Sequence, residues 1–506
     1  MEPNYIIVQA GGKGTRMGHL TANKPKGIVP VDNLPIIFHL FRKYPDKHFI
    51  IICDYLHEVL EKYLKVFAEV DYRCVVAEGV GTCCGFKQAF SLVPEKTPFM
   101  LIWSDLILND AFQMPSVPGD YIGISESFEC RWSLKEGKFV EERSSADGVA
   151  GCFVFQNQKD FSDVPAEGEF VRYLASKPLG FKRLSMQGSC EVGTLLAYEA
   201  KKKDYVCRPF NSMTITSTRV IKKPITDQGV ELAKKESNWY RRASELGFRA
   251  IPKIYGYSPL EMKRVEGGNP FKLSLSDSEK KEVVGNAVKA LSSLHSFHKE
   301  PANPRSIMEC YLDKTYSRIE KIKDLVPFAQ EQEISINGAR YANPFFLKEK
   351  VEAWVKKIAT GTKEFSFIHG DSTFSNLLVK KDLSVVLIDP RGYFGDTLLY
   401  GDPFYDWSKL YYSIVGNYDQ FNAKNFVLDV HPDAISLTIG SSGYESFAPI
   451  LLAGFSEEEK RKIRFLHALI WLSLSTYAWE DYDSICGAFY NGTKLLSESL
   501  KEEGLL

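Results

Sequence analysis

The sequence predicts two α/β regions in series, one built on a mainly parallel sheet and one with a small antiparallel sheet followed by helices. Two observations indicate this. Up to about residue 205, short apolar runs alternate with amphipathic segments at the spacing of βαβ units. Beyond it, β-branched residues alternate over 212–225, and helical patterns dominate from about residue 277. The length of 506 residues accommodates several domains of roughly 100–200 residues each.

In the first region, apolar runs bounded by turn residues predict buried strands. Amphipathic segments at 36–44 and 58–67 lie between these runs and fit helices that cover a sheet. Parallel sheets bind ligands at the carboxyl ends of their strands, so the loop after the first strand and the aspartate that ends the fourth become candidates for chemistry. The predicted strands are YIIVQA (5–10), HFIIICD (48–54), YRCVVAE (72–78) and FMLIWSD (99–105).

The predicted domain boundary lies near residue 205, with a first domain over 1–205 and a second over 206–506. A turn and a closing helix precede the boundary in SCEVGTLLAYEAKKKD, and no spacer rich in proline, serine or glycine follows it. The second region is predicted to contain antiparallel strands over 212–225, a helix over 231–247, strands at 365–371 and 383–390, and a buried core helix over 465–479.

The composition excludes several classes of protein. With 44% hydrophobic and 25% charged residues, the chain is neither largely disordered nor fibrous. The net charge of −1 gives no general reason to bind nucleic acid or an anionic membrane. The first residues lack the pattern of a secretory signal, and the 10 cysteines are scattered without a CxxC pair. We therefore expect a cytoplasmic protein with reduced thiols and no membrane insertion.

The first candidate site is the glycine-rich loop GGKGTRMG (11–18), directly after the first predicted strand. Gly11, Gly12 and Gly14 let the backbone turn tightly and direct N–H groups at an anion, and Arg16 offers a fork of donors to phosphate. The spacing differs from that of a Walker A loop and of a GxGxxG fingerprint. Taken alone, the loop fits a phosphate cradle and a plain solvated turn equally well.

Further segments favour the phosphate cradle. KPKGIVPV (24–31) brings Lys26 within reach of the loop, GVGTCCGFKQA (79–89) supplies a second glycine turn, and Asp105 ends a strand. Together these segments resemble the nucleotidyltransferase family that makes nucleotide sugars and CDP-activated alcohols. Over roughly residues 5–202, the family patterns match in order as GGKGTRM, PKGIVPV and the acid-plus-GT motif EVGT, which begins at Glu191.

This resemblance implies a Rossmann-like fold, Mg²⁺ as cofactor and a role for each matched residue. Arg16 and Lys26 would contact the phosphates at the reacting centre, and Asp105 and Glu191 would hold Mg²⁺. The family usually has aspartate at the second metal position, and glutamate keeps the charge but adds a methylene. The resemblance further implies nucleotide binding by Gly11, Gly12, Gly14, Thr15, Gly81 and Thr82, and acceptor binding by Gly151 and Glu169.

The second candidate site combines HGDSTFSN (369–376) with LIDPRG, in which Asp389 stands 13 residues after Asn376. An acid, an amide five residues on and a second acid ending a strand form a set suited to phosphoryl transfer. Asp371 would orient the acceptor hydroxyl, while the amide and the second acid would hold Mg²⁺. Either motif alone is explained better as a turn, but both together, each beside an apolar strand, favour the site.

These motifs resemble the choline kinase and aminoglycoside phosphotransferase family, which has a bilobal protein-kinase-like fold. The resemblance implies a small lobe over about 206–265 and a helical large lobe over about 266–506. It makes Asp371 the catalytic base and Asn376 and Asp389 the magnesium ligands.

Upstream, RVIK (219–222) resembles the strand that carries the nucleotide-binding lysine. Lys222 is the preferred residue and Lys223 its alternative, because one register slip would exchange them. Glu236 stands where the family pairs a helix glutamate with this lysine. Arg391, directly after the DP of the metal site, is assigned to the acceptor. The aromatic residues that follow fit core packing better than a cation–π site for choline.

Together the two resemblances predict a bifunctional enzyme with ATP, a second NTP (CTP favoured) and a small sugar or amino alcohol as partners. The kinase would phosphorylate the acceptor, and the nucleotidyltransferase would couple that phosphate to the NTP. The product would be an NDP-activated precursor for surface glycan or capsule synthesis. The alternatives are a choline kinase joined to a CTP:phosphocholine cytidylyltransferase, and a catalytically dead regulatory or scaffold protein. Assembly as a homo-oligomer is left open.

Overall fold

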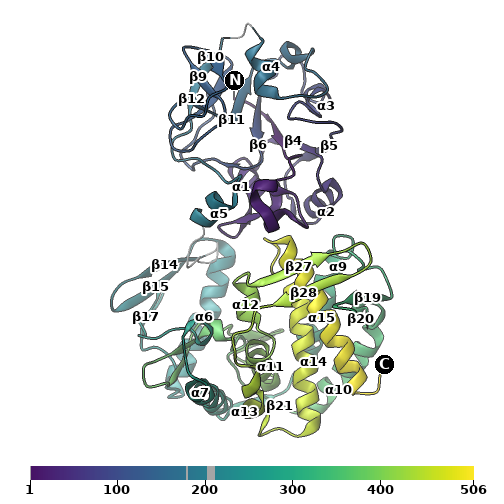
Figure 1. Ribbon diagram of the computed structural model, residues 1–506. Helices are drawn as coiled ribbons and strands as arrows, with labels where there is room; N and C mark the ends of the chain where they lie inside the picture. The colour runs from purple at the N-terminus through teal and green to yellow at the C-terminus, as the bar shows by residue number, and fades with distance from the viewer. Residues whose placement is uncertain (1, 178–179, 202–210) are drawn as a thin grey trace. The chain divides into compact units, whose positions relative to one another are not determined.

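The computed structural model describes residues 2–177, 180–201 and 211–506 (Figure 1). The chain divides into two compact units. Unit 1 comprises Met1–Val206 and Trp479–Asp483, and unit 2 comprises Cys207–Ala478 and Ser484–Leu506. The boundary predicted near residue 205 falls in 202–210, outside the described residues. Both units mix helices and strands, which confirms the predicted α/β class.

Unit 1 is built on a nine-stranded sheet with a parallel centre, as predicted (Figure 1). β1 (Tyr5–Gln9) pairs in parallel with β4 (His48–Cys53) and β6 (Phe99–Trp103), and β5 (Tyr72–Val76) extends the sheet beyond β4. β11 (Gly148–Phe155) joins β6 in the antiparallel sense and is buried along its whole length. The smaller strands of this unit are β2 (Pro30–Val31), β3 (Leu34–Pro35), β7 (Leu106–Ile107), β8 (Tyr121–Ser125), β9 (Ser133–Lys135), β10 (Lys138–Val140), β12 (Lys182–Ser185) and β13 (Cys190–Glu191).

Two helices of unit 1 stand where the amphipathic pattern predicts them. The two predicted at 36–44 and 58–67 are α1 (Ile36–Lys43) and α2 (His57–Phe67). Each turns its apolar side inward, because Ile37, Leu40 and Leu64 are almost fully buried. The remaining helices are α3 (Phe86–Ser91), α4 (Phe170–Ala175) and α5 (Leu195–Lys201).

The register of the parallel strands brings two candidate segments to one edge of the sheet. Gln9 at the end of β1 lies beside Trp103 at the end of β6, and the Ser104 N–H donates to the Gln9 carbonyl at 3.1 Å. The glycine-rich loop after β1 and Asp105 after β6 therefore leave the sheet side by side. This is the edge at which such sheets bind ligands.

Unit 2 begins with the antiparallel strands predicted over 212–225. β14 (Asn211–Ile215) pairs with β15 (Arg219–Pro224), and the sheet continues through β17 (Leu260–Lys263) to β16 (Ile254–Tyr257). α6 (Asp227–Glu245) packs on β15. It starts four residues before the predicted 231 because the Thr226 hydroxyl caps it by accepting from the Gly229 N–H.

The rest of unit 2 is mainly helical, as predicted. Capping boxes at Ser276–Glu279 and Ser456–Glu459 start two long helices, α7 (Asp277–His295) and α14 (Glu457–Leu474). The core helix predicted over 465–479 lies in the second half of α14. Its residues from Phe465 are buried, as predicted, but the helix ends at Leu474. The other α-helices are α8 (Pro304–Met308), α9 (Lys314–Lys321), α10 (Lys348–Gly361), α11 (Pro403–Ile414), α12 (Tyr418–Asn422), α13 (Ala448–Leu452) and α15 (Tyr482–Glu502).

Short strands interrupt these helices. Those predicted at 365–371 and 383–390 are β21 (Glu364–Phe367) and β23 (Val385–Leu387), each shorter than predicted. The motif residues leave the strands because Gly370 and Asp389 both adopt positive φ angles, of 80° and 54°. The others are β18 (Lys299–Pro301), β19 (Glu333–Ile336), β20 (Ala339–Ala342), β22 (Leu377–Val379), β24 (Tyr393–Phe394), β25 (Thr397–Leu398), β26 (Tyr400–Gly401), β27 (Phe426–Val430) and β28 (Ile435–Ile439).

Among the described residues, no helix is both long and apolar enough to cross a membrane.

Candidate functional sites

The glycine-rich loop of unit 1 is open to solvent and locally constrained. Gly14 has a φ of 62°, and a Cβ there would lie 2.9 Å from Thr21 Cγ2, so the turn requires glycine. Gly12, Thr15 and Arg16 are exposed. The loop therefore offers its backbone and a guanidinium to a ligand from solution.

Lys26 and Asp105 form the centre of the unit 1 site. The Lys26 ammonium lies 2.6 Å from Asp105 Oδ2, and Asp105 is only 6% exposed. Burial opposes ionisation of Asp105, but the charge and hydrogen bond of Lys26, together with the charge of Arg16, outweigh it and lower the pKa of the carboxyl. The structure thus brings together two predicted residues that are 79 positions apart in the chain.

Glu191 joins this pair from a neighbouring strand. β13 pairs with β7, and the Val192 N–H donates to the Asp105 carbonyl at 2.8 Å. A Cβ at Gly193 would lie 2.4 Å from Glu191 Oε1 and 2.6 Å from Asp105 Oδ2, so both carboxylates face one small volume. Arg16 lies 3.3 Å from Glu191.

This pair of carboxylates suits a divalent cation. Burial, followed by the negative charge of Asp105, raises the pKa of Glu191. Two carboxylates at one place repel each other, so ionising both costs free energy. A hard cation between them would relieve that cost, and Mg²⁺ accepts one or two carboxylates while keeping waters and phosphates as its other ligands. The residues present therefore fit the ion implied for this site.

The predicted base and acceptor residues are linked to the end of β1, because the Gln9 side-chain N–H₂ donates to the Thr82 carbonyl at 3.0 Å. At Gly81, whose φ is 107°, a Cβ would stand 2.3 Å from the Gly168 carbonyl oxygen, so the glycine turn is pressed against the segment that contains Glu169. The hydroxyl of Thr82 accepts from the Phe170 N–H at 2.8 Å. The segment with Gly81 and Thr82 thus packs against the segment with Glu169.

Gly151 is held in place by a tryptophan. Its φ is 74°, and a Cβ there would overlap the ring of Trp103, two residues before Asp105. Glu169 accepts a hydrogen bond from the Trp132 indole at 2.8 Å. Any larger residue at position 151 would displace the Trp103 ring at the end of β6.

In unit 2, the two motif-bearing turns of the sequence form one site. The Asn376 side-chain N–H₂ donates to Asp371 Oδ2 at 2.9 Å, and the Asn376 carbonyl accepts from the Ile388 N–H at 2.9 Å, directly before Asp389. The nitrogen of the amide is thereby committed to Asp371, so its oxygen is the atom suited to a metal. An amide oxygen and the Asp389 carboxylate fit Mg²⁺ as part of a set completed by nucleotide phosphates.

The lysine of β15 points into this site. The Lys222 ammonium lies 2.8 Å from Glu236 on α6 and 3.0 Å from Asp389 Oδ1, whereas Lys223 is exposed. The strand register therefore places Lys222, rather than its alternative, beside the two acids. An ammonium at this place can neutralise phosphates beside Asp389, one of the two residues predicted to hold Mg²⁺.

A buried aspartate that no sequence pattern singles out holds the Asp371 loop. Asp406 on α11 is completely buried and accepts from the N–H groups of His369 and Gly370, both at 2.7 Å. Its carboxylate also lies 2.9 Å from the His295 Nε2 atom. The His369 ring contacts the Ile388 carbonyl at 3.0 Å, which ties the two motif loops together.

Two cationic residues, Lys409 and Arg391, contact the loop that contains Asp371. Lys409 on α11 lies 3.0 Å from Asp371 Oδ1, and no motif in the sequence points to it. Arg391 donates to the Tyr393 hydroxyl at 2.9 Å and to the Tyr405 hydroxyl at 3.2 Å. The backbone N–H of Arg391 donates to the His369 carbonyl, so this residue, predicted to bind the acceptor, is attached to the loop that contains Asp371.

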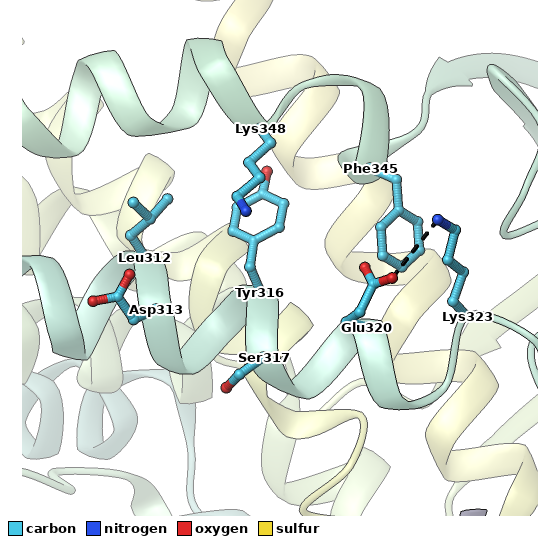
Figure 2. Close-up of a pocket in the computed structure, with 8 residues that line it drawn as sticks. All are labelled: Leu312, Asp313, Tyr316, Ser317, Glu320, Lys323, Phe345 and Lys348. Carbon is cyan, nitrogen blue, oxygen red and sulfur yellow. Dashed lines mark ion pairs between the residues drawn. The ribbon is translucent and has the colours of Figure 1, made fainter.

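A cavity of about 430 Å³ lies elsewhere in unit 2 (Figure 2). Tyr316 and Lys348 stand close together in it, and Glu320 forms an ion pair with Lys323 at 3.7 Å. No residue predicted for either site lines this cavity. Its lining comprises Leu312, Asp313, Tyr316, Ser317, Glu320, Lys323, Phe345 and Lys348.

Sequence comparisons agree with both resemblances. The model of the Phosphotransferase enzyme family matches residues 213–433. The N-terminal region is similar to the UTP–glucose-1-phosphate uridylyltransferase AglF of Haloferax volcanii, at 40% identity over 57 residues, and to a glucose-1-phosphate cytidylyltransferase of Salmonella typhimurium, at 38% over 60 residues. Each match covers 11% of this chain and only 24% and 23% of the relatives' own lengths.

Solved structures of both kinds are also similar. HddC from Yersinia pseudotuberculosis aligns at 19% identity and a TM-score of 0.34, over 40% of this chain and 98% of its own. The ADP-bound aminoglycoside phosphotransferase APH(2'')-Ib aligns at 16% identity and a TM-score of 0.36, over 58% and 92%. The sequence matches confirm a region of the Phosphotransferase enzyme family type over 213–433 and a nucleotidyltransferase-like N-terminal region in one chain.

Proposed function

We propose that this chain catalyses two consecutive transfers. Unit 2 moves the γ-phosphoryl group of ATP to a hydroxyl of a small acceptor, and unit 1 then couples the new phosphate to an NTP with release of pyrophosphate. The observation that supports this most directly is that each unit gathers its own lysine and carboxylates. Lys26 lies 2.6 Å from Asp105, and Lys222 lies 3.0 Å from Asp389.

In unit 2, Asp371 accepts the proton of the acceptor hydroxyl as that oxygen attacks the γ-phosphorus and ADP leaves. Asp406 positions the loop through two backbone N–H groups, and Lys222 neutralises phosphate charge. Asn376 and Asp389 would hold Mg²⁺, which when bound offsets the charge of the phosphates.

In unit 1, an oxygen of the phosphomonoester attacks the α-phosphorus of the NTP, and pyrophosphate leaves. Both reactants are anions, so the step depends on positive charge rather than on a protein nucleophile. Lys26, Arg16 and the N–H groups of the glycine-rich loop supply that charge, and Asp105 and Glu191 would hold the metal. The exposure of Arg16 and Gly12 suits a ligand that enters from solution.

We infer CTP as the second nucleotide and a sugar-like phosphate as the coupled group. The two curated relatives act, by their names, on glucose 1-phosphate, one with CTP and one with UTP. A kinase that phosphorylates a sugar hydroxyl would supply a substrate of this class. The activated product fits a precursor of surface glycan synthesis.

The test uses the full chain with Mg²⁺, ATP and each of CTP, UTP, GTP and dTTP, with pyrophosphate release as the measurement. Asp371→Asn should lose coupling from the free acceptor and keep it from the phosphorylated one. Asp105→Asn should still convert ATP to ADP but release no pyrophosphate. Loss of both activities in Asp371→Asn would contradict the division of labour between the units. Absence of thermal stabilisation by any of these nucleotides would instead indicate a scaffold protein.

A further inference from the structure

Four cationic side chains from three separate elements of unit 2 converge around Tyr405, and one of them, Lys409, also contacts Asp371. Lys314 and Arg318 lie one turn apart on α9, Lys409 lies on α11, and Arg391 follows Asp389. We call these four residues the cation cluster. No run of charge in the sequence contains them, so the fold assembles the cluster.

The ring of Tyr405 is the point that joins the cluster. Arg391 donates to its hydroxyl at 3.2 Å, and the ammonium groups of Lys314 and Lys409 lie 5.3 and 5.9 Å from its centroid. Burial would raise the pKa of Tyr405, but the charges of Lys314, Lys409 and Arg391 lower it. Burial, together with the charge of Arg391, lowers the pKa of Arg318.

These cations have mostly neutral partners. Within the part of the chain that the structure describes, only Lys409 of the four forms an ion pair, and its partner is Asp371. Arg391 contacts two phenol hydroxyls, Lys314 lies 3.2 Å from the Cys310 sulfur, and Arg318 donates to the Ser473 carbonyl at 2.7 Å. Partly buried like charges without counter-charges are costly, and a bound anion would remove that cost.

The cluster lies on the acceptor side rather than on the nucleotide side. The nucleotide side already has Lys222, which is engaged by Glu236 and Asp389. The cluster instead touches Asp371, the residue proposed to bind the acceptor hydroxyl, through Lys409. The backbone N–H of Arg391 donates to the His369 carbonyl at 2.9 Å, two residues before Asp371 in the same loop.

We propose that the acceptor phosphorylated by unit 2 is a polyhydroxylated molecule with an anionic group, a carboxylate or a phosphate, which Arg391 and Lys314 bind. The proposal rests on the proposed function of the Asp371 site. A cationic acceptor such as choline or an amino sugar would meet like charge here. The rings of Tyr393 and Tyr405, which it would need, are already engaged by Arg391 and the two lysines.

A binding experiment tests the proposal without knowledge of the natural acceptor. The full chain is loaded with Mg²⁺ and a non-hydrolysable ATP analogue, which fills the γ-phosphate position, and is titrated calorimetrically with glucuronate, glucose 6-phosphate, glucose and glucosamine. We expect the two anions to bind at least tenfold more tightly than glucose or glucosamine. Tighter binding of glucuronate would indicate a carboxylate site, and tighter binding of glucose 6-phosphate would indicate a phosphate site. Equal or tighter binding of glucose or glucosamine would overturn the proposal.

Variants locate the binding. Arg391→Met and Lys314→Met should weaken the anion at least tenfold, while Lys348→Met, a matched change at the cavity of Figure 2, should leave it unchanged. Lys314 is only partly buried, so its variant keeps the test valid if Arg391→Met fails to fold. Anion binding that is equal in all variants would refute the assignment. If the ATP analogue itself fails to bind, the proposed function fails; if it binds and no anion follows, only this inference fails.

Discussion

The ammonium of Lys409 lies 3.0 Å from Asp371 Oδ1, in the loop that the sequence predicts to be catalytic. The same ammonium lies 5.9 and 5.4 Å from the ring centroids of Tyr405 and Tyr412, which stand on the same helix. Packing of α11 therefore fixes the direction from which Asp371 meets its acceptor. Lys409 is a positioning residue in this arrangement.

Lys409→Met should lower kcat of phosphoryl transfer by about 10²-fold, the scale of a displaced general base. The KM for ATP should change little, because the nucleotide side is held by Lys222 and Glu236. Lys409→Arg should restore part of the rate, and Lys289→Met, on the exposed side of α7, should match the native enzyme. A rise in the KM for ATP with kcat intact would place Lys409 at the nucleotide instead.

Gly193→Ala should abolish most of the nucleotidyl transfer while leaving the fold intact. The new Cβ would stand 2.4 Å from Glu191 Oε1 and 2.6 Å from Asp105 Oδ2, so the two carboxylates must separate. Loss of a preorganised charge site costs about 10²–10³-fold in rate, which pyrophosphate release measures. Gly180→Ala, where a Cβ meets nothing within 4 Å, is the matched control. Full activity of Gly193→Ala would show that the pair does not share an ion.

Magnesium removal should act on the two units separately. With saturating Mg²⁺ and nucleotide at 100 times Kd, binding adds about 2.7 kcal/mol to stability, which chelation should remove. Asp389→Asn should eliminate the stabilisation of unit 2 by Mg²⁺ and ATP but retain that of unit 1 by Mg²⁺ and CTP. Thermal unfolding with each nucleotide measures both effects. Loss of both responses in Asp389→Asn would contradict two independent metal sites.

The sequence predicts the parts of these sites that lie at strand ends. Apolar runs define β1, β4, β5 and β6, and the glycine-rich loop and Asp105 follow two of them directly. Because parallel strands end at a common edge of their sheet, this arrangement of strands and loops already favours a short distance between the loop and Asp105.

Contacts over long separations could not be predicted in the same way. Asp406 stands 37 residues after His369, and its role depends on how α11 packs, which no local pattern encodes. The choice between Lys222 and Lys223 likewise depends on the pairing of β15 with β17 and on its packing against α6. Strand periodicity alone leaves such a choice open, since a slip by one residue exchanges the two faces.

Acid should destabilise unit 2 through His467. The side chain is 2% exposed on α14, its Nε2 accepts from the Trp471 indole at 2.9 Å, and burial lowers its pKa to about 3. Between pH 6.5 and 3, the unfolded chain therefore binds a proton that the folded chain excludes, so stability is present above pH 6.5 and falls as the pH drops. The loss between pH 7 and pH 4 should be about 3 kcal/mol in the free energy of unfolding.

Urea unfolding of the native chain and of His467→Gln at pH 7, 5 and 4 measures this loss. The glutamine keeps an acceptor for Trp471 but cannot titrate, so its unfolding midpoint should fall less steeply with acid, whatever its value at pH 7. His431→Gln, a change at an exposed histidine of the same unit, should retain the native slope. Equal acid dependence in the native chain and His467→Gln would mean that protonation of this imidazole does not drive acid unfolding, because the titrating proton would then bind elsewhere.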